Sequence, residues 1–412
     1  MQACPARLTC LRSQHRARRR ATTIRVKSAG SKTELADEEL PIRVRTAIVH
    51  DWFQGYHGAE RVVEAMRTGL FDQRSRPDIF TFSAARELLP PGLSESIVRE
   101  SRVSRLPGIR QRGHRPGMWR YFLPYMPHYF SHLDLEAYDL VISSSHACAV
   151  NVRPREDAVH LCYCYTPMRY AWMPGVDKRA EGIMEPALSA FRSYLRRSDL
   201  AASARPDGYA AISTAVAERI RDFYNREAEV IHPPVDLEDF DSTQPKDPDL
   251  FVWAHRLVNY KRPDLVVEAF RGIPYRLVMV GVGPLEAQLR ERLPPNVELR
   301  GWLERDELAS LYAQASGFVH VGEEDFGITM VEALASGTPV IALDGGGAKD
   351  IVRNEEDGFL LTEVDVASLR AAIHKVAGST WSRERLAARA ADFSRPRFVQ
   401  RLGEFTSELL RT

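Results

Sequence analysis

Short apolar segments alternate with stretches of helical periodicity on both sides of one proline- and aspartate-rich segment. This pattern limits the folds open to the chain. Before that segment, residues 44–49 (VRTAIV) predict a strand and residues 59–70 a helix. The segment itself, residues 232–249 (HPPVDLEDFDSTQPKDPD), has no periodicity. A strand at 250–254 and a helix at 263–270 then restart the alternation. Such alternation is typical of parallel βαβ units.

We therefore expect an α/β protein of two doubly wound, Rossmann-like domains that face each other across a cleft. The first domain is predicted at residues 43–235 and the second at 250–395, with a linker at 236–249. Residues 396–412 are predicted as a C-terminal helix that packs back on the first domain. Ligands of such sheets bind beyond the carboxyl ends of the strands, which points to the cleft as the site.

Composition excludes several classes of protein. The chain has 412 residues, of which 44% are hydrophobic and 27% charged, as in ordinary globular proteins. Five cysteines exclude a disulfide scaffold and fit a reducing compartment. No apolar run is long enough for a transmembrane helix. Beyond residue 33 the chain has eight more acidic than basic side chains, which disfavours nucleic acid as a partner.

Residues 1–33 contain nine basic residues and no acidic one. This composition suits an organellar transit peptide, and it equally suits a disordered basic extension over residues 1–42. We expect a cytoplasmic protein, peripheral to a membrane, with an organellar location as the alternative if residues 1–33 are a transit peptide.

Two cations follow the strand at 250–254. Arg256 stands at the strand end and Lys261 in the expected first turn of the next helix, where Pro263 fits the first helical position. Together with free backbone amides, two cations make an anion site able to hold a diphosphate without a metal. The alternative is that both are solvated surface charges.

A second loop carries acidic residues. Glu323 to Ile328 (EEDFGI) run into a helix that contains Glu332. Carboxylates at a strand end commonly cap the following helix, but they also accept hydrogen bonds from vicinal hydroxyls. Gly327 lets a ligand approach the backbone closely. A third loop, Asp344 to Gly347, has three consecutive glycines and is either part of the site or a flexible connection.

Taken in order, these motifs resemble the retaining glycosyltransferases of family 4, which have the GT-B fold. The resembling segments are HRLVNYKRPDLVVEAF (255–270), EDFGITMVE (324–332) and ALASGTPVIALDGGG (333–347), within a likeness that covers about residues 44–405. The resemblance implies that Arg256 and Lys261 hold the donor diphosphate, that Glu324 contacts the donor sugar and that Glu332 contacts the ribose. The other expected donor-binding residues are Asp325, Phe326, Gly327 and Ile328.

The first domain resembles GDP-mannose-dependent mannosyltransferases of bacterial polysaccharide assembly. The segments are IVHDWFQGYHGAERV (48–62), YDLVISSSHACAV (138–150) and LCYCYTPMRYAW (161–172). His146 matches the family's cleft histidine near the donor hexose and is predicted as catalytic together with Glu324; the alternative is a structural histidine. Asp51 and Gly58 are expected at an acceptor-side or phosphate loop. The chain departs from the subgroup at Tyr165, where a histidine is usual, and at Lys349–Asp350, where an apolar–Glu pair is usual.

Three patterns are interpreted as incidental. Cys162 and Cys164 alternate along one strand and lack the partners of a zinc site, so packing is their expected role. The DxD-like elements at 239–241 and 247–249 lie in the expected linker and are taken as chance. The Gly281-x-Gly283 pair lacks the third glycine of a dinucleotide-binding motif.

A basic and aromatic segment covers residues 99–130. It holds Arg99, Arg102, Arg105, Arg110, Arg112, Arg115 and Arg120, with Trp119, Tyr121, Phe122, Tyr125, Tyr129 and Phe130. It is either a solvated loop over a partly buried aromatic cluster or a surface that lies on an anionic bilayer.

The sequence as a whole predicts a metal-independent, retaining hexosyltransferase without a cofactor. Its expected partners are a nucleotide sugar, best GDP-mannose, and a hydroxyl of a glycan or lipid-linked acceptor. The family implies a front-face route in which the leaving phosphate takes the acceptor proton. A double displacement would instead need a carboxylate nucleophile, for which Glu324 is the candidate among the motif residues. The alternatives are a sugar-nucleotide epimerase on the same fold and a non-catalytic, membrane-docked scaffold.

Overall fold

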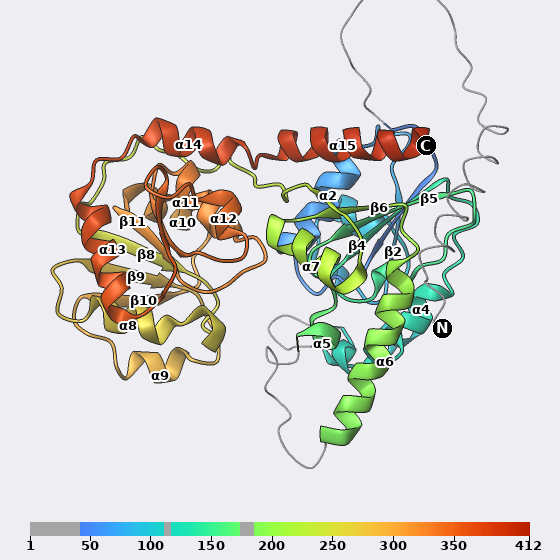
Figure 1. Ribbon diagram of the computed structural model, residues 1–412, viewed down its shortest axis with the longest axis horizontal. Coiled ribbons are helices and arrows are strands. Elements are labelled where there is room, and N and C mark those ends of the chain that lie inside the picture. The colour runs from blue at the N-terminus through green and yellow to red at the C-terminus, as the bar shows by residue number, and fades with distance from the viewer. Residues whose placement is uncertain (1–41, 111–116, 174–184) are drawn as a thin grey trace, which may run out of the picture. The chain divides into compact units, whose positions relative to one another are not determined.

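The computed structural model describes residues 42–110, 117–173 and 185–412 and separates into two compact units (Figure 1). The first unit comprises the described residues up to Ala211 together with Arg219–Glu229 and Val399–Thr412. The second comprises Ile212–Glu218 and Val230–Phe398. Each unit contains one parallel sheet with helices on both faces, so the prediction of two doubly wound α/β domains is confirmed.

The sheet of the first unit has the strand order β3-β2-β1-β4-β5-β6-β7. Its strands are β1 (Thr46–His50), β2 (Asp78–Thr81), β3 (Ile97–Arg99), β4 (Leu140–Ser145), β5 (Val159–Cys164), β6 (Gly208–Ala211) and β7 (Glu229–Val230). The pairs from β3 to β6 are parallel. Every residue of β1, β4 and β5 is buried, as expected for strands covered on both faces.

Helices cover both faces of this sheet. They are α2 (Gly58–Gly69), α3 (Pro91–Glu95), α4 (Met126–Ser131), α5 (Arg169–Trp172), α6 (Glu185–Ser203), most of α7 (Thr214–Tyr224) and the end of α15 (Arg395–Arg411). Short 3₁₀ helices are η1 (Arg86–Leu88), η2 (Arg102–Arg105), η3 (Met118–Phe122) and η4 (Ala149–Asn151). In Figure 1, α2 and α15 lie above the strands and α4, α5 and α6 below them.

Glycines let α15 pack closely on the first unit. A Cβ on Gly69, the last residue of α2, would overlap the side chain of Val399. A Cβ on Gly208, the first residue of β6, would lie 2.7 Å from a methyl carbon of Leu409. The segment 399–412 therefore belongs to the first unit, although the second unit precedes it in the sequence.

The second unit has a six-stranded sheet of order β10-β9-β8-β11-β12-β13, with all pairs parallel. Its strands are β8 (Leu250–Ala254), β9 (Arg276–Val280), β10 (Val297–Gly301), β11 (Gly317–His320), β12 (Val340–Leu343) and β13 (Gly358–Leu361). Its helices are η6 (Asn259–Lys261), α8 (Pro263–Phe270), α9 (Glu286–Arg290), α10 (Arg305–Gln314), α11 (Ile328–Ala335), α12 (Ala348–Ile351), α13 (Val366–Gly378) and α14 (Arg383–Ala391). In Figure 1, α8 and α13 lie on one side of the strands and α10 and α11 on the other.

Residues 236–249, expected as a linker, lie within the second unit and pack against it. The backbone amide of Asp247 donates to the carbonyl of Gln314, and Arg276 pairs with the Asp247 carboxylate. Lys246 donates to the hydroxyl of Thr338. The Pro- and Asp-rich composition therefore prevents regular helix and strand here without preventing specific contacts.

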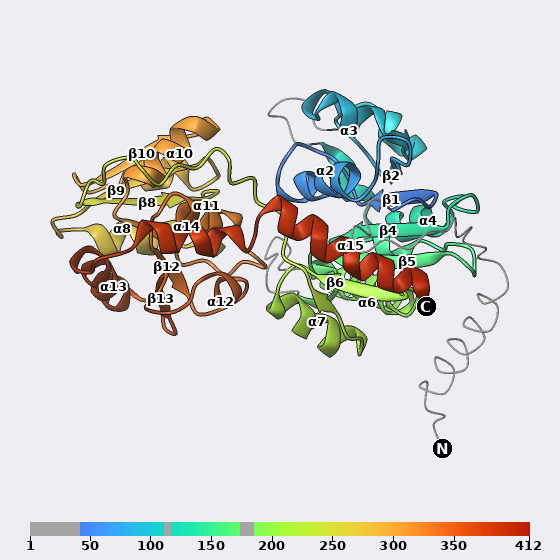
Figure 2. The same cartoon turned by 90° about the horizontal axis from the view of Figure 1, so that it is seen from above.

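Both sheets have a point at which the strand order reverses. In the first it lies between β1 and β4, and in the second between β8 and β11 (Figure 2). Loops that leave two neighbouring strands in opposite directions at such a point create a crevice at the carboxyl ends of the strands, where ligands of open α/β sheets bind. Each unit thus has one place at which functional side chains are expected to gather.

Some sequence predictions concern residues outside the described ranges. These are the basic extension, together with Arg112 and Arg115 of the basic and aromatic segment. Within the described ranges, no helix combines the length and the apolar character needed to cross a membrane.

Candidate functional site

Lys261 and Glu324 form an ion pair at the reversal point of the second sheet. Lys261 ends η6, which follows β8, and Glu324 lies in the loop after β11. The lysine side chain is 4% exposed and the glutamate 28% exposed, so the lysine lies beneath the carboxylate. The two motifs that the sequence predicted as a donor site are therefore in direct contact. Lys261 itself precedes α8 and is not in its first turn, because α8 begins at Pro263.

Two histidines, of which His320 is buried and His255 partly exposed, accompany this pair and were not predicted as site residues from the sequence. His255 follows β8 and His320 ends β11; their rings meet edge to face at 4.4 Å between centroids. The Nε2 atom of His320 lies 3.7 Å from Oε2 of Glu324. Burial holds the pKa of both histidines well below the usual value, and the charge of Lys261 acts in the same direction. Both rings are therefore neutral. The sequence signal that could have identified these histidines is their position at the ends of two strands.

Arg256 and Glu332 complete the predicted set. Arg256 is exposed in the loop after β8. Glu332 lies on α11, is 8% exposed and has Oε1 3.5 Å from Nη1 of Arg305. Arg305 also pairs with Asp239 and donates to the carbonyl of Asp236. Arg305, which sequence reasoning missed, thus connects the segment after residue 235 with the carboxylate expected to contact the ribose.

The three glycines at 345–347 form more than a flexible connection. Gly346 has φ +56°, and a Cβ there would overlap the carbonyl oxygen of Glu324. The amide of Gly347 donates to that same oxygen at 2.9 Å, and a Cβ on Gly347 would overlap the backbone of Phe326. Only residues without side chains let the loop after β12 support the Glu324 loop this closely.

The Gly281–Gly283 pair has a similar role. Gly281 has φ +138°, and a Cβ there would overlap the carbonyl oxygen of His255. A Cβ on Gly283 would overlap the carbonyl oxygen of Leu257. The pair thus allows the loop after β9 to lie against the loop that carries Arg256. Close packing between loops explains these glycines without a dinucleotide-binding motif.

The remaining residues of the predicted donor loop have different environments. Phe326 is 4% exposed, and its ring stacks on that of His232 with 5.6 Å between the centroids. Its side chain is therefore part of the core, and only its backbone can contact a ligand. Gly327 has φ +106° and caps α11, which has no side-chain cap. Asp325 and Ile328 are partly exposed beside it. The first turn of α11 therefore presents backbone amides next to Glu324.

The DxD-like elements and the Lys349–Asp350 pair have structural partners. Asp239 pairs with Arg305, Asp247 with Arg276, and Asp241 accepts hydrogen bonds from Thr243. The Asp350 carboxylate accepts a hydrogen bond from the backbone amide of Thr214, the first residue of α7. A carboxylate at a helix start stabilises the helix.

Asp51 occupies the reversal point of the first sheet, directly after β1. Its side chain is fully buried, and each carboxylate oxygen accepts two backbone hydrogen bonds from the loop after β4. The donors are the amides of residues 146–149, at 2.6 to 3.0 Å. The Asp51 carboxylate does not reach the surface, so its contacts are with this loop, and the placement of Asp51 at an acceptor-side or phosphate loop stays a prediction.

His146 lies in the loop that Asp51 holds. Its Nδ1 atom is 3.4 Å from Oδ2 of Asp51, and its side chain remains 25% exposed. The ring packs edge to face on Trp52 at 4.5 Å and lies 6.0 Å from the ring of Tyr165. Burial lowers the pKa of His146, and the Asp51 charge opposes that shift. A neutral, partly exposed imidazole fits a role in binding hydroxyl groups.

Tyr165 and Gly58 border this place. Tyr165, which replaces the usual histidine, is buried; its hydroxyl bonds to Ser144 Oγ at 2.9 Å and donates to the carbonyl of Ala59. Gly58 is the first residue of α2, one residue before the predicted start, and Glu60 accepts a hydrogen bond from the amide of His57 at that helix start. Tyr165 thus joins the start of α2 to β4.

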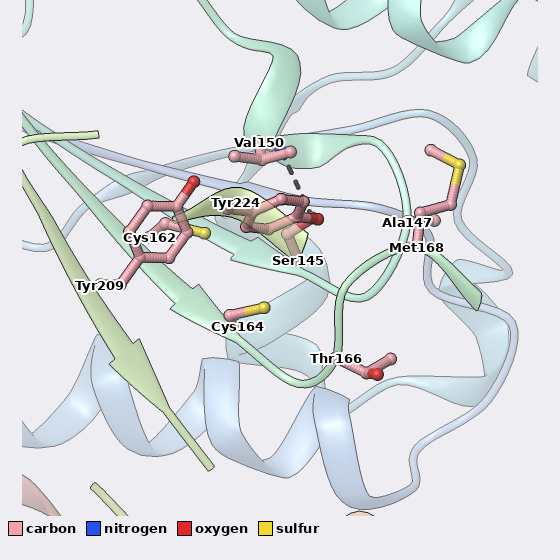
Figure 3. Close-up of a pocket in the computed structure, with 9 residues that line it drawn as sticks. All are labelled: Ser145, Ala147, Val150, Cys162, Cys164, Thr166, Met168, Tyr209 and Tyr224. Atoms are coloured by element: carbon pink, nitrogen blue, oxygen red, sulfur yellow. Dashed lines mark hydrogen bonds between the residues drawn. The ribbon is translucent and has the colours of Figure 1, made fainter. Parts of the chain in front are cut away.

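A small pocket lies beside β5 in the first unit (Figure 3). It is lined by Ser145, Ala147, Val150, Cys162, Cys164, Thr166, Met168, Tyr209 and Tyr224. Its free volume of about 10 Å³ is the space of one water molecule, too small for a sugar. Cys162 and Cys164 line its wall and are free thiols, which agrees with a packing role.

Comparison with known proteins identifies the family. A model described as Glycosyltransferase Family 4 matches residues 56–239, and one described as Glycosyl transferases group 1 matches residues 235–393. The chain belongs to glycosyltransferase family 4. The resemblance stated from the motifs is thereby confirmed, and each unit matches a glycosyltransferase model.

Relatives of the family 4 transferase share parts of the chain. A GDP-mannose-dependent alpha-mannosyltransferase of Mycobacterium tuberculosis is 41% identical over 107 residues, which are 26% of this chain and 28% of that protein. A D-inositol 3-phosphate glycosyltransferase of Xylanimonas cellulosilytica is 30% identical over 223 residues, 47% of this chain and 54% of that protein. The chain thus matches between about a quarter and about a half of the length of these relatives.

A solved structure establishes the fold of this transferase. The structure of Anabaena HepE in complex with UDP has a TM-score of 0.65 and 18% identity, over 88% of this chain and 100% of that chain. The two Rossmann-like units accordingly have the GT-B fold, as the motifs predicted. At this identity the likeness concerns the fold alone.

Proposed function

We propose that this transferase moves a hexose from a nucleotide sugar to an acceptor hydroxyl with retained anomeric configuration, and that GDP-mannose is its donor. The observation that carries the proposal is the contact of Lys261 with Glu324 at the reversal point of the second sheet. A cation and a carboxylate in contact are the two groups that a diphosphate and a sugar hydroxyl respectively require.

Donor binding would exchange partners within this pair. A diphosphate at the exposed Arg256 attracts the Lys261 ammonium, which frees Glu324 to accept hydrogen bonds from the sugar hydroxyls. The amides at the start of α11 add partial positive charge beside the same loop. As the bond from the sugar to phosphate breaks, these groups stabilise the charge that grows on the leaving diphosphate.

In the front-face route, a leaving phosphate oxygen takes the proton of the attacking acceptor hydroxyl. The acceptor oxygen then bonds to the anomeric carbon on the face that the phosphate leaves, which preserves the configuration. This route needs no nucleophilic carboxylate. In this route Glu324 binds the donor sugar, because its carboxylate accepts hydrogen bonds from the sugar hydroxyls and lies beside Lys261.

The mannosyl assignment rests on the Mycobacterium tuberculosis relative and on the motifs of the first unit. Thermal-shift measurements with GDP, UDP, ADP and their sugars test it. We expect GDP and GDP-mannose to raise the Tm most. A larger shift with UDP or ADP sugars would overturn the mannosyl assignment and leave the transferase class intact.

Donor turnover separates transfer from epimerisation. Without acceptor, a transferase should leave GDP-mannose unchanged over the same time in which, with an added acceptor extract, mannose is transferred and GDP is released. Conversion of GDP-mannose to another GDP-hexose without acceptor would favour the epimerase instead. Donor binding without turnover under any acceptor would favour the non-catalytic scaffold.

We further propose that the basic and aromatic segment contacts an anionic membrane that presents a lipid-linked acceptor. Support comes from exposed side chains in the described part of the segment: Arg102, Arg105, Met118, Arg120, Tyr121 and Tyr125. Trp119 and Phe130 are buried, and Arg110 pairs with Glu100, so these three do not face lipid. Bases and aromatic rings at one surface suit lipid headgroups.

Liposome co-sedimentation of a variant that begins at residue 34 tests this surface. Binding should require anionic lipid, weaken with salt, and fall when Arg102, Arg105 and Arg120 are changed to Glu. The matched control changes the exposed Arg290, Arg292 and Arg300 of the second unit to Glu and should bind as before. Equal pelleting with neutral and anionic vesicles would overturn the proposal.

A further inference from the structure

The buried carboxylate of Asp51 determines the position of the loop that carries His146. Four consecutive amides, from residue 146 to 149, converge on its two oxygens. An ionised carboxylate has lone pairs for all four donors, whereas an amide or a hydroxyl has not. The loop thus leaves β4 on one defined path, and the Cα of His146 is fixed by a residue 95 positions earlier in the chain.

The same carboxylate faces one nitrogen of the His146 ring. Oδ2 lies 3.4 Å from Nδ1, and Nδ1 is buried without a hydrogen-bond partner among the described residues. A neutral imidazole carries its single proton on one of two nitrogens. A proton on Nδ1 places the positive end of the N–H dipole toward the carboxylate, whereas a lone pair there would be repelled by it.

Other charged or polar groups around the ring do not reverse this preference. The ring of His50 lies 5.8 Å away and that of Tyr165 6.0 Å away, between centroids. The hydroxyl of Tyr165 is engaged by Ser144 and Ala59. Arg169 contributes a positive charge that disfavours a second proton on the ring, as burial does. Asp51 is therefore the nearest charge that distinguishes the two nitrogens.

We propose that Asp51 is a positioning residue that fixes His146 as the Nδ1-protonated tautomer and thereby presents Nε2 as a hydrogen-bond acceptor to a sugar hydroxyl. The ligand in this statement rests on the proposed function; the tautomer does not. In the described residues no hydrogen bond engages Nε2, and the ring is 25% exposed. A hydroxyl donor, and not an anion, is the chemical group that such a nitrogen recognises.

Nitrogen-15 NMR of the full chain labelled at its histidine rings tests the tautomer without any substrate. The His146 signals are assigned by their loss in His146→Gln. We expect a protonated Nδ1 and an unprotonated Nε2 near pH 7.5. A majority of the Nε2–H tautomer, or a ring doubly protonated at that pH, would overturn the proposal even if the protein were an active transferase.

Asp51→Asn should shift the His146 tautomer populations toward Nε2–H, and Asp207→Asn is the matched control. Asp207 also accepts a backbone amide hydrogen bond in this unit, from His160. We expect kcat to fall roughly 10- to 100-fold in Asp51→Asn with little change in donor KM, as when a residue that orients a functional histidine is removed. If Asp51→Asn fails to fold, the wild-type spectrum still decides the question.

A double-variant comparison separates positioning from general stability. Once His146 is Gln, the further change Asp51→Asn should cost much less activity than it does alone, because both act through one ring. Additive losses in kcat would mean that Asp51 acts only through the stability of the fold, and the proposal would fail.

Discussion

At the residue scale, the second unit concentrates its functional charge in one pair, Lys261 and Glu324. A buried ammonium is costly unless it is paired, and the Glu324 carboxylate is the partner of Lys261, whose side chain is 4% exposed. In the donor site that we propose, an anion would displace the carboxylate from this cation. Affinity for a diphosphate would then be the difference between two strong interactions.

Replacing either predicted phosphate ligand should weaken donor binding. We expect Arg256→Ala and Lys261→Ala each to reduce kcat/KM at limiting donor by roughly 10- to 150-fold, the worth of one hydrogen bond to a charged group. Arg262→Ala is the control, because that exposed neighbour donates to the carbonyl of Val364. Full activity in both variants would show that the diphosphate binds elsewhere.

At the element scale, the glycine contacts between loops predict sharp positional effects. Gly346→Ala introduces a Cβ that overlaps the Glu324 carbonyl, at a positive φ that side chains disfavour, so it should displace the Glu324 loop. Gly345→Ala meets only ordinary contacts at 3.5 Å and should be tolerated. The measurement is donor KM for both variants. Similar values for the two would contradict the support that we assign to this loop.

The start of α2 should make stability depend on pH. Glu60 is 8% exposed, and burial raises its pKa from 4.5 to about 7. The Glu60 carboxyl loses its proton near pH 4.5 in the unfolded chain and only near pH 7 in the folded chain. Its contribution to the free energy of unfolding is therefore fully present below pH 4.5 and falls as the pH rises to 7. Glu60→Gln should remove that fall and be more stable at pH 8, by up to about 3 kcal/mol.

Thermal unfolding at pH 5 and pH 8 checks this prediction. The Tm advantage of Glu60→Gln over the wild type should grow between the two pH values. The exposed Glu87→Gln is the control and should show no such growth. An equal Tm difference at both pH values would mean that Glu60 ionises normally in the folded protein.

The sequence predicted those elements whose signals are local. The strand at 250–254 was predicted correctly, because five apolar residues lie between turn-forming segments and all are buried. The amide cage of Asp51 was not predictable, because its donors lie 95 to 98 positions away. The His255–His320 contact likewise depends on which strands become neighbours. Sequence motifs thus singled out the loops that we predict to bind the donor, while roles that depend on tertiary contacts needed the structure.

At the scale of the whole molecule, the donor site that we propose would use cations and helix amides in place of a metal ion. We expect transfer to survive excess EDTA unchanged, because Arg256, Lys261 and the start of α11 can neutralise the diphosphate. The measurement is initial rate with and without chelator. Loss of activity that magnesium or manganese restores would contradict metal independence.

The last fourteen residues have a consequence for synthesis on the ribosome. The entire polypeptide from Val230 to Phe398 is made after β6 and before the segment that packs on Gly208. The nascent chain must therefore hold an incomplete amino-terminal sheet, with apolar side chains still uncovered, while the second unit folds. Contacts of such long sequence separation form slowly. The yield of folded protein should then depend on how well a chaperone shields this surface during translation and on how soon the carboxyl-terminal helix leaves the ribosome. The stability of either unit should matter less.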